Sequence, residues 1–203
     1  GTRRPYGLME WAALLRKLGV PAPRTWTFND LEALRVRAHE IPFPVLLKPE
    51  QGGSGARITL VESFAHLEAL LKERPEHWLP DNLLLLQEYL DADPARGIVR
   101  MEFLGGELLY AMRVISHGRF NLCPAPVCNP EEGETTVCEV QSSAPPAEFH
   151  PCKEVHPQAV AWGKRIVAAG KLDVAGIEYL ETRGVPVVAI GQPKLPGFYA
   201  RSS

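Results

Sequence analysis

A lysine and a glycine-rich loop that follow one short apolar segment are the residues best suited to chemistry. Residues 45–47 are apolar, Lys48 comes directly after them, and the segment 50–56 reads EQGGSGA. A lysine at the end of a strand can hold its ammonium over a phosphate, and glycines let consecutive backbone N–H groups approach phosphate oxygens. The order differs from a Walker P-loop, because the lysine precedes the glycines. We therefore interpret the segment as a phosphate-binding loop, with a flexible hairpin loop beside a surface lysine as the alternative.

Apolar periodicity and turn residues predict the elements that must position this loop. Helical spacing and capping residues predict helices at 8–18, 30–39, 64–73 and 156–169. Short apolar or alternating runs predict strands at 25–28, 45–49, 57–61 and 83–90, and hairpins that pair 98–103 with 107–115 and 174–180 with 185–190. Strands and helices do not alternate regularly, and antiparallel hairpins dominate after the first helices. The expected fold class is therefore α+β, with two lobes.

The overall composition is that of an ordinary globular protein and excludes several classes. The 203 residues are 45% hydrophobic and 23% charged, and the net charge of −2 comes with no basic cluster. Nucleic-acid-binding domains usually carry a basic excess or patch, so we do not expect nucleic acid as a partner. No apolar run, including residues 83–86, comes near the roughly 18 residues that span a bilayer, so no membrane partner is expected either.

The cysteines and six prolines mark the segment 121–153 as unusual. It contains Cys123, Cys128, Cys138 and Cys152, whose spacing C-x4-C-x9-C-x13-C does not fit a common zinc site. We interpret them as free thiols of a reducing compartment, which favours a cytoplasmic protein. A thiol or zinc protein remains an alternative. Because the prolines leave little periodicity, we expect this segment to be a long surface excursion.

Four short motifs occur in the order in which the ATP-grasp family has them. The segment 19–25 (GVPAPRT) resembles the family's G-I-P-x-P-x-T sequence after its first helix, and 43–49 (FPVLLKP) resembles its F-P-x-x-x-K-P strand. The segment 86–90 (LQEYL) is similar to its Q-E-Y-I hinge, and 176–180 (GIEYL) to its G-V-D strand. This resemblance covers most of the chain. It implies the ATP-grasp fold, in which ATP lies between two lobes.

The resemblance also implies roles for individual residues. Lys48 and the glycine-rich loop would hold the phosphates, and the hinge would hold the adenine. Arg100 and Arg113, on adjacent strands of a hairpin, would reach the transferring phosphoryl group as catalytic residues, since guanidinium binds phosphate oxygens bidentately; solvated charges on a strand face are the alternative. Arg4 is the nearest candidate for a further basic residue near the first helix. The implied ATP-binding residues are Lys48, Gly52, Gly53, Ser54, Gly55, Ala56, Gln87, Glu88, Tyr89, Leu90 and Asn121.

The magnesium site of the family is matched only in part. The resemblance implies Mg²⁺ ions held by carboxylates and an asparagine from two neighbouring strands, and Glu178 fits the first carboxylate. On the next strand, Gly191 stands where an acid is expected and Pro193 where the asparagine is expected, although residues 195–198 (LPGF) match. The loss of a bridging carboxylate should weaken metal binding, and with it phosphoryl transfer.

Two hypotheses for the function follow. The resemblance implies an ATP-dependent ligase that uses ATP and Mg²⁺, activates the carboxylate of a small molecule or peptide as an acyl phosphate, and joins it to an amine. The departure at Gly191 favours the alternative, a catalytically degenerate ATP-grasp domain with a nucleotide-binding or regulatory role. We expect the first lobe within residues 1–90, with the lobe proper over about 25–90, and the second over 91–203. An oligomer is compatible with both hypotheses.

Overall fold

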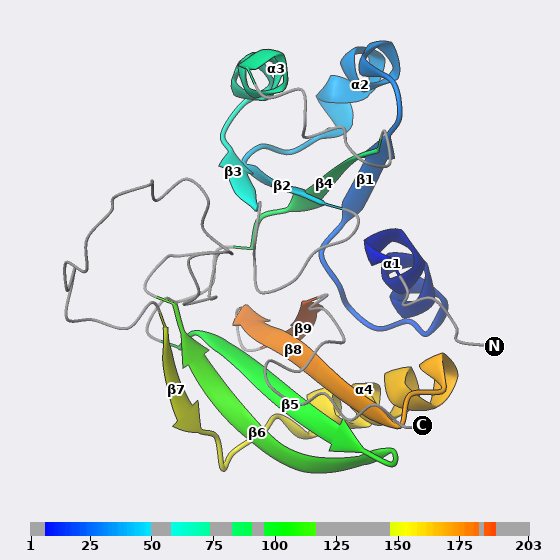
Figure 1. The fold of residues 1–203 in the computed structure, drawn as a ribbon, viewed down its shortest axis with the longest axis vertical. Coiled ribbons are helices and arrows are strands. Elements are labelled where there is room, and N and C mark those ends of the chain that lie inside the picture. Colours follow the sequence, from blue (N-terminus) through cyan, green and yellow to red (C-terminus); the bar gives the residue numbers. More distant parts are fainter. Residues whose placement is uncertain are drawn as a thin grey trace, which may run out of the picture.

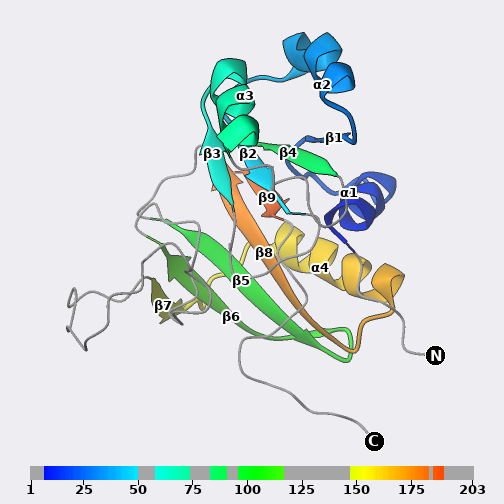
Figure 2. The ribbon, with the colours of Figure 1, turned by 45° about the horizontal axis from the view of Figure 1, so that its top comes forward.

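The computed structural model describes residues 7–49, 58–73, 83–90, 96–116, 147–182 and 185–189. These residues form two antiparallel sheets with helices packed against them, as Figure 1 shows. Figure 2, turned by 45°, also shows the smaller sheet at one end of the larger one. The predicted α+β class is confirmed. Among the described helices, none is long and apolar enough to cross a membrane.

A four-stranded sheet forms from the first half of the chain. Its strands are β1 (Thr25–Phe28), β2 (Val45–Lys48), β3 (Thr59–Val61) and β4 (Leu84–Glu88), in the order β1-β4-β2-β3. The helices of this half are α2 (Leu31–Arg37), the short 3-10 helix η1 (Ala38–Glu40) and α3 (Phe64–Glu73). Neighbouring strands run antiparallel, and α2 and α3 lie on the side of the sheet that faces away from the rest of the molecule (Figure 1).

Capping and apolar spacing explain why these elements form. The carboxylate of Asp30 caps α2 by accepting hydrogen bonds from the backbone N–H groups of Glu32 and Ala33. Apolar side chains of α2 and α3 meet alternate side chains of β2 and β3. The buried core of this half includes Leu34, Val45, Leu47, Val61 and Leu67. Since side chains alternate along a strand, Lys48 points to the other face of the sheet, away from the two helices.

A five-stranded sheet forms from the second half of the chain. Its strands are β5 (Ile98–Leu104), β6 (Glu107–Ile115), β7 (Glu148–Pro151), β8 (Val174–Thr182) and β9 (Val185–Ala189), in the order β7-β6-β5-β8-β9. Every neighbouring pair is antiparallel. The expected hairpins β5–β6 and β8–β9 are therefore confirmed, and they meet through β5 and β8 at the centre of the sheet.

Helix α4 (Pro157–Gly170) covers one face of the five-stranded sheet. The helix and sheet approach closely at Gly163, where a Cβ atom would lie only 2.3 Å from Cζ of Phe103. The buried residues of this core include Val99, Met101, Phe103, Trp162, Ile166, Ile177 and Tyr179. Because the odd-numbered residues of β5 and β8 face α4, the even-numbered residues Arg100 and Glu178 face the opposite side.

Helix α1 (Leu8–Lys17) packs into the same core, although it comes first in the chain. Its side chains Trp11 and Leu15 are buried in the cluster that α4 and the five-stranded sheet form. Between α1 and β1, the carbonyl oxygen of Pro21 accepts a hydrogen bond of 2.9 Å from the backbone N–H of Val188 in β9. The chain is thus attached to the five-stranded sheet before it enters the four-stranded one.

Two expectations about secondary structure differ from what the structure shows. Strand β7 lies within the segment 121–153, which we expected to be an irregular excursion throughout; its backbone pairs with β6, and it forms an edge of the five-stranded sheet. This pairing, rather than a side-chain pattern of its own, defines β7. Helix α4 includes Gly170 instead of ending before it, and Lys171 takes the left-handed conformation with φ of 53°.

Candidate functional site

Each sheet has an inner face, which we define as the face that turns away from its own helices. The inner face of the four-stranded sheet carries Lys48 on β2. The inner face of the five-stranded sheet carries Arg100 on β5 and Glu178 on β8. The negative charge of Glu178 raises the pKa of Lys48 against the effect of burial, so these two side chains lie close enough for their charges to interact. Figure 1 shows the corresponding arrangement, with the four-stranded sheet above the ends of the larger sheet. The structure therefore places Lys48, Arg100 and Glu178, three residues that the sequence analysis singled out, on these two inner faces.

Lys48 forms a hydrogen bond to a neutral side chain. Its Nζ donates to Oε1 of Gln87 at 2.6 Å, and Nε2 of Gln87 donates to Oγ1 of Thr25 at 3.1 Å. The strand register explains the contacts, because Gln87 lies opposite Thr25 on one side and Leu46 on the other. Gln87 is only 2% exposed. The predicted residue Gln87 therefore holds the lysine in place on the inner face.

Removal from water changes the acidity of Lys48. It disfavours the ammonium form and lowers the pKa of Lys48 to about 8, although the negative charge of Glu178 acts in the opposite direction. The side chain is still mostly protonated at neutral pH. An anion bound beside it would favour the ammonium and raise the pKa again. Lys48 is thus a shielded cation, and a bound anion would offset the cost of its burial.

Arg100 lies between two carboxylates. Its Nη1 donates to Oε1 of Glu178 at 2.8 Å across the strands, and its Nε donates to Oε1 of Glu102 at 2.5 Å along the same strand. The three side chains are 12%, 21% and 5% exposed for Arg100, Glu178 and Glu102. Burial disfavours the charged guanidinium, but the two carboxylates outweigh it and raise the pKa of Arg100.

A glycine makes room for this ion pair. Gly176 is the direct partner of Glu102 in the register of β5 and β8. A Cβ atom at Gly176 would lie 2.3 Å from Nη2 of Arg100 and 3.1 Å from Oε2 of Glu102. Within the described part of the chain, these two atoms are buried and have no hydrogen-bond partner. The guanidinium therefore packs directly against the backbone of β8, where any larger residue would displace it.

The predicted hinge residues lie where β4 ends. Glu88 is its last residue, and Tyr89 and Leu90 follow it with partly exposed side chains. The Glu88 carboxylate accepts hydrogen bonds from the backbone N–H of Arg24 at 3.1 Å and from its Nε at 3.4 Å. The hinge motif thus contacts the motif at 19–25. The sequence alone did not predict Arg24 as a partner of the hinge.

Arg113 does not share a face with Arg100. In the register of β5 and β6, Arg100 lies opposite Met112, whereas Arg113 lies opposite Val99, whose side chain is buried beneath α4. The Arg113 guanidinium donates a hydrogen bond to the carbonyl oxygen of Arg96. The two arginines that we predicted to act together therefore lie on opposite faces of the sheet, because their strand positions differ by one residue in register.

Several predicted residues lie outside the described part of the chain. They are Arg4, Gly52, Gly53, Ser54, Gly55, Ala56, Asn121, Gly191 and Pro193. Of the four cysteines, only Cys152 is described, as a free and partly exposed thiol. The roles of the undescribed residues stay predictions.

Glu178 is the described residue best suited to hold magnesium. Mg²⁺ is usually bound through one or two carboxylates together with substrate phosphates and water. Glu178 is a partly exposed hard oxygen donor on the inner face. No group of three or more His, Cys, Asp or Glu side chains within the described ranges could hold a metal ion by itself. The donor present fits a magnesium ion whose remaining ligands are phosphate oxygens and water.

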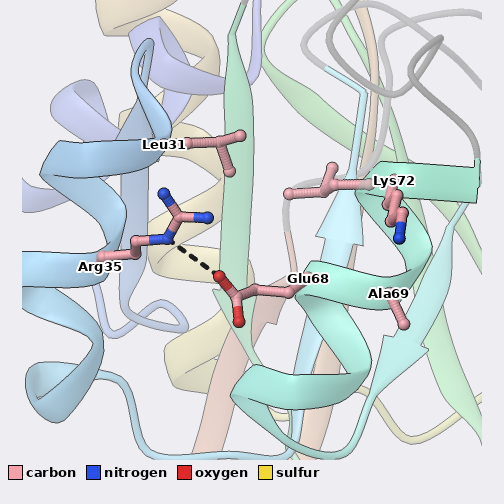
Figure 3. A pocket seen from close by; sticks show the side chains of 6 residues that line it. Leu31, Arg35, Glu68, Ala69 and Lys72 are labelled. Atoms are coloured by element: carbon pink, nitrogen blue, oxygen red, sulfur yellow. Dashed lines mark hydrogen bonds and ion pairs between the residues drawn. The ribbon is translucent and has the colours of Figure 1, made fainter.

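A hollow of about 480 Å³ lies between α2 and α3, on the other side of the four-stranded sheet. Figure 3 shows Arg35 and Glu68 across it, joined by a hydrogen bond of 2.9 Å. The remaining lining residues are Leu31, Ala69, Leu71 and Lys72. Since its arginine is already paired and the motif residues Lys48 and Glu178 lie on the inner faces, this hollow is a poor candidate for the functional site.

Glu102 and Gly176 are the site residues that sequence reasoning missed. The available signal was the pattern Arg-x-Glu at 100–102, because residues two apart on a strand share a face. Gly176 belongs to the motif at 176–180, but its role becomes visible only when the register places it opposite Glu102.

The comparisons with known proteins agree with this architecture. The sequence matches no known protein-family model. A curated relative, the C-terminal section of the carbamoyl phosphate synthase large chain from Methanopyrus kandleri, is 26% identical over 136 residues, which is 64% of this chain and 25% of that protein.

Similar solved structures are ATP-grasp ligases. PsnB with its precursor peptide and AMPPNP is 19% identical, with a TM-score of 0.59 over 93% of this chain and 50% of that chain. A RimK domain protein from Sphaerobacter thermophilus is 21% identical, with a TM-score of 0.57 over 91% of this chain and 56% of that chain. D-alanine–D-alanine ligase from Bacillus anthracis with ATP is 14% identical, with a TM-score of 0.61 over 89% of this chain and 53% of that chain. The chain spans about half the length of these structures. Fold comparison and motif order agree: this chain has the ATP-grasp fold.

Proposed function

We propose that this chain binds ATP between its two inner faces and uses it to join a carboxylate to an amine. A carboxylate oxygen attacks the γ-phosphorus, the bond from that phosphorus to the β–γ bridging oxygen breaks, and ADP leaves. The amine nitrogen then attacks the carbonyl carbon of the acyl phosphate, phosphate leaves, and the nitrogen gives up a proton. Both steps move negative charge, which fixed cations stabilise.

The observation that carries the proposal is that Lys48, on the four-stranded sheet, lies within range of the negative charge of Glu178, on the five-stranded sheet. Lys48 supplies a cation whose direct partner is the neutral amide of Gln87, so its charge is available to a phosphate. Arg100 supplies a second cation on the facing sheet, next to Glu178. A nucleoside triphosphate matches this distribution of charged groups, because its phosphates are anionic and need both cations and a magnesium ligand.

Further residues extend the proposed site. The backbone of Tyr89 and Leu90 would read the adenine, with Glu88 near its amino group and the loop residues 52–56 closing over the phosphates. Glu178 would hold Mg²⁺, which when bound neutralises phosphate charge during transfer. A precursor peptide is bound to PsnB, and D-alanine is named for the Bacillus enzyme. We therefore propose an amino acid or a peptide as the substrate class.

Nucleotide binding and turnover test the proposal. We expect the non-hydrolysable analogue AMPPNP to bind in calorimetry, and ADP to appear when ATP, Mg²⁺ and a pool of amino acids are supplied. Lys48→Met should weaken AMPPNP binding at least about tenfold, the equivalent of ~1.4 kcal/mol, because a phosphate loses its cation. The matched control is Lys72→Met, an exposed lysine in α3 of the same half. Equal binding by the two variants would contradict the role of Lys48.

A second candidate function is nucleotide binding without catalysis. It is favoured by Glu178 being the one carboxylate we can assign to magnesium within the described ranges, and by Gly191 standing in the sequence where an acid is expected. This candidate predicts AMPPNP affinity that hardly changes with Mg²⁺ and no ADP formation. Binding that requires Mg²⁺, together with ADP release, would exclude it.

A further inference from the structure

Glu102 has no part in the proposed reaction, yet it is one of the most deeply buried charged groups described. Its relative exposure is 4%, and within the described part of the chain its hydrogen-bond partner is Arg100, through Nε. A carboxylate is costly to bury unless it is paired. Arg100 already has a carboxylate partner in Glu178. The second carboxylate therefore needs a reason of its own.

The two carboxylates hold different atoms of the guanidinium. Glu102 accepts from Nε, the nitrogen nearest the backbone, and both residues belong to β5. Glu178 accepts from the terminal Nη1, comes from the neighbouring strand, and has a side chain that is 21% exposed, against 5% for Glu102. Glu102 is thus the shielded partner and Glu178 the accessible one. A ligand that approaches the inner face reaches Glu178 first.

Gly176 strengthens this difference. The absence of a side chain there lets Nη2 of Arg100 and Oε2 of Glu102 pack against β8, within 2.3 Å and 3.1 Å of the place a Cβ atom would take. Arg100 and Glu102 therefore pack together in the space that Gly176 leaves beside β8. Glu178 lies beside this space, opposite Arg100 in the register, and is not among the atoms that pack against Gly176.

We propose that Glu102 is a positioning residue: it stays paired with Arg100, so that Glu178 is able to leave the ion pair and turn toward magnesium. The inference rests on the proposed function. If Glu178 were the sole counter-ion of Arg100, its departure would leave a shielded guanidinium without a carboxylate, and the ion pair would compete with the metal. Glu102 removes that competition while holding the guanidinium on the inner face.

The first test measures how much Mg²⁺ the binding of AMPPNP requires. The binding is measured by calorimetry at increasing Mg²⁺ concentrations. In Glu102→Gln, we expect the Mg²⁺ concentration for half-maximal binding to rise about tenfold, as is typical when a residue behind a metal ligand is changed. The matched control is Glu181→Gln, which removes a carboxylate from an arginine of the same sheet, Arg96, in a more exposed pair. The control should leave the magnesium requirement unchanged.

A folded Glu102→Gln variant with the magnesium requirement of the unaltered protein would overturn the inference. A variant that is merely less stable would lower the unfolding temperature without moving the magnesium requirement, so the readout separates the two roles. If Glu102→Gln does not fold, Glu102→Asp takes its place, because it keeps the charge and draws it back by one methylene. A smaller rise in the same direction is then expected, and no rise contradicts the inference.

The second test needs no nucleotide, so it stands even if the proposed function fails. The Nε–H resonance of Arg100, assigned by its loss in Arg100→Lys, should exchange slowly with solvent in the free protein. Glu102→Gln should abolish the slow exchange, whereas Glu178→Gln should leave it. The reverse result would make Glu178 the permanent partner and overturn the inference. Failure of AMPPNP to bind the unaltered protein would instead reject the proposed function.

Discussion

Lys48 on the four-stranded sheet and Arg100 on the five-stranded sheet are both cations largely shielded from water, but their partners differ in charge. Lys48 donates to the neutral amide of Gln87, and its removal from water lowers its pKa to about 8. Arg100 donates to two carboxylates, Glu102 and Glu178, which raise its pKa in spite of burial. One cation is thus left without a direct anionic partner in the described part of the chain, and the other has two.

This difference assigns the two regions different parts in binding. The surroundings of Lys48 gain most from an incoming anion, because a phosphate supplies the charge that Gln87 lacks. The cluster around Arg100 is already compensated, so a ligand there must replace an existing partner. Since Glu178 is the accessible partner, it is the group to be replaced. Under the proposed function, Lys48 on the four-stranded sheet would bind phosphate, and Glu178 on the five-stranded sheet would be exchanged as a partner of Arg100.

Arg100→Met should have the largest effect on stability, because it leaves Glu102 buried without its cation. Breaking a buried pair in this way costs about 3–5 kcal/mol. The matched control is Arg96→Met, which removes the exposed partner of Glu181 and should cost less than about 1 kcal/mol. Urea denaturation at neutral pH measures both. Equal losses would mean that the cluster around Arg100 is no more coupled than a surface ion pair.

The pH dependence of the free energy of unfolding should reveal the lowered pKa of Lys48. Because the folded pKa of Lys48 is about 8 and the ordinary value is 10.5, the unfolded chain binds more protons between these values, and stability rises with pH there. At pH below about 8 the buried ammonium costs up to about 3 kcal/mol. Lys48→Met should therefore be more stable than the unaltered protein near neutral pH, with the difference shrinking toward pH 10.5.

Urea denaturation of both proteins across this pH range measures the difference, with Lys72→Met as the control. Lys72 is exposed, so its removal should leave the pH profile parallel to that of the unaltered protein. A difference between Lys48→Met and the unaltered protein that stays constant with pH would contradict the lowered pKa.

The elements and the lysine could be predicted from the sequence because their signals are local. Apolar periodicity located the helices and hairpins, and a charged residue directly after an apolar strand identified Lys48. Glu178 was singled out from its place in the motif at 176–180, and its role toward magnesium stays a prediction. Strand β7 was missed because its four residues, in a proline-rich segment, owe their conformation to pairing with β6.

The contacts around Arg100 could not be predicted, because they depend on how distant strands are registered. Residues 100 and 178 meet only through the pairing of β5 with β8. The glycine at 176 has a clear function only once it lies opposite Glu102. The neutral partner of Lys48 is hidden for the same reason: Gln87 was assigned from its motif to the nucleotide, and the register of β2 with β4 brings it to the lysine.

Gly163→Ala sharpens the comparison between the two faces of the five-stranded sheet. The added Cβ would lie 2.3 Å from Cζ of Phe103 on the face that α4 covers. Overpacking of this kind costs about 1–3 kcal/mol, and the better helix propensity of alanine returns about 0.5–1 kcal/mol. We expect a net loss of about 1–2 kcal/mol in thermal or urea denaturation. AMPPNP binding to the folded variant should not change; a weaker affinity would couple the covered face to the site.

Arg113→Met should have the smallest effect and tests the register directly. The sequence alone paired Arg113 with Arg100 at the phosphates, but in the sheet Arg113 lies opposite Val99, on the face that α4 covers. Its guanidinium holds the carbonyl of Arg96, a contact whose loss should cost about 1 kcal/mol or less. AMPPNP affinity should change by less than about threefold, ~0.7 kcal/mol. A loss as large as that of Lys48→Met would mean that Arg113 reaches the nucleotide from the other face, and that the sheet must rearrange when ATP binds.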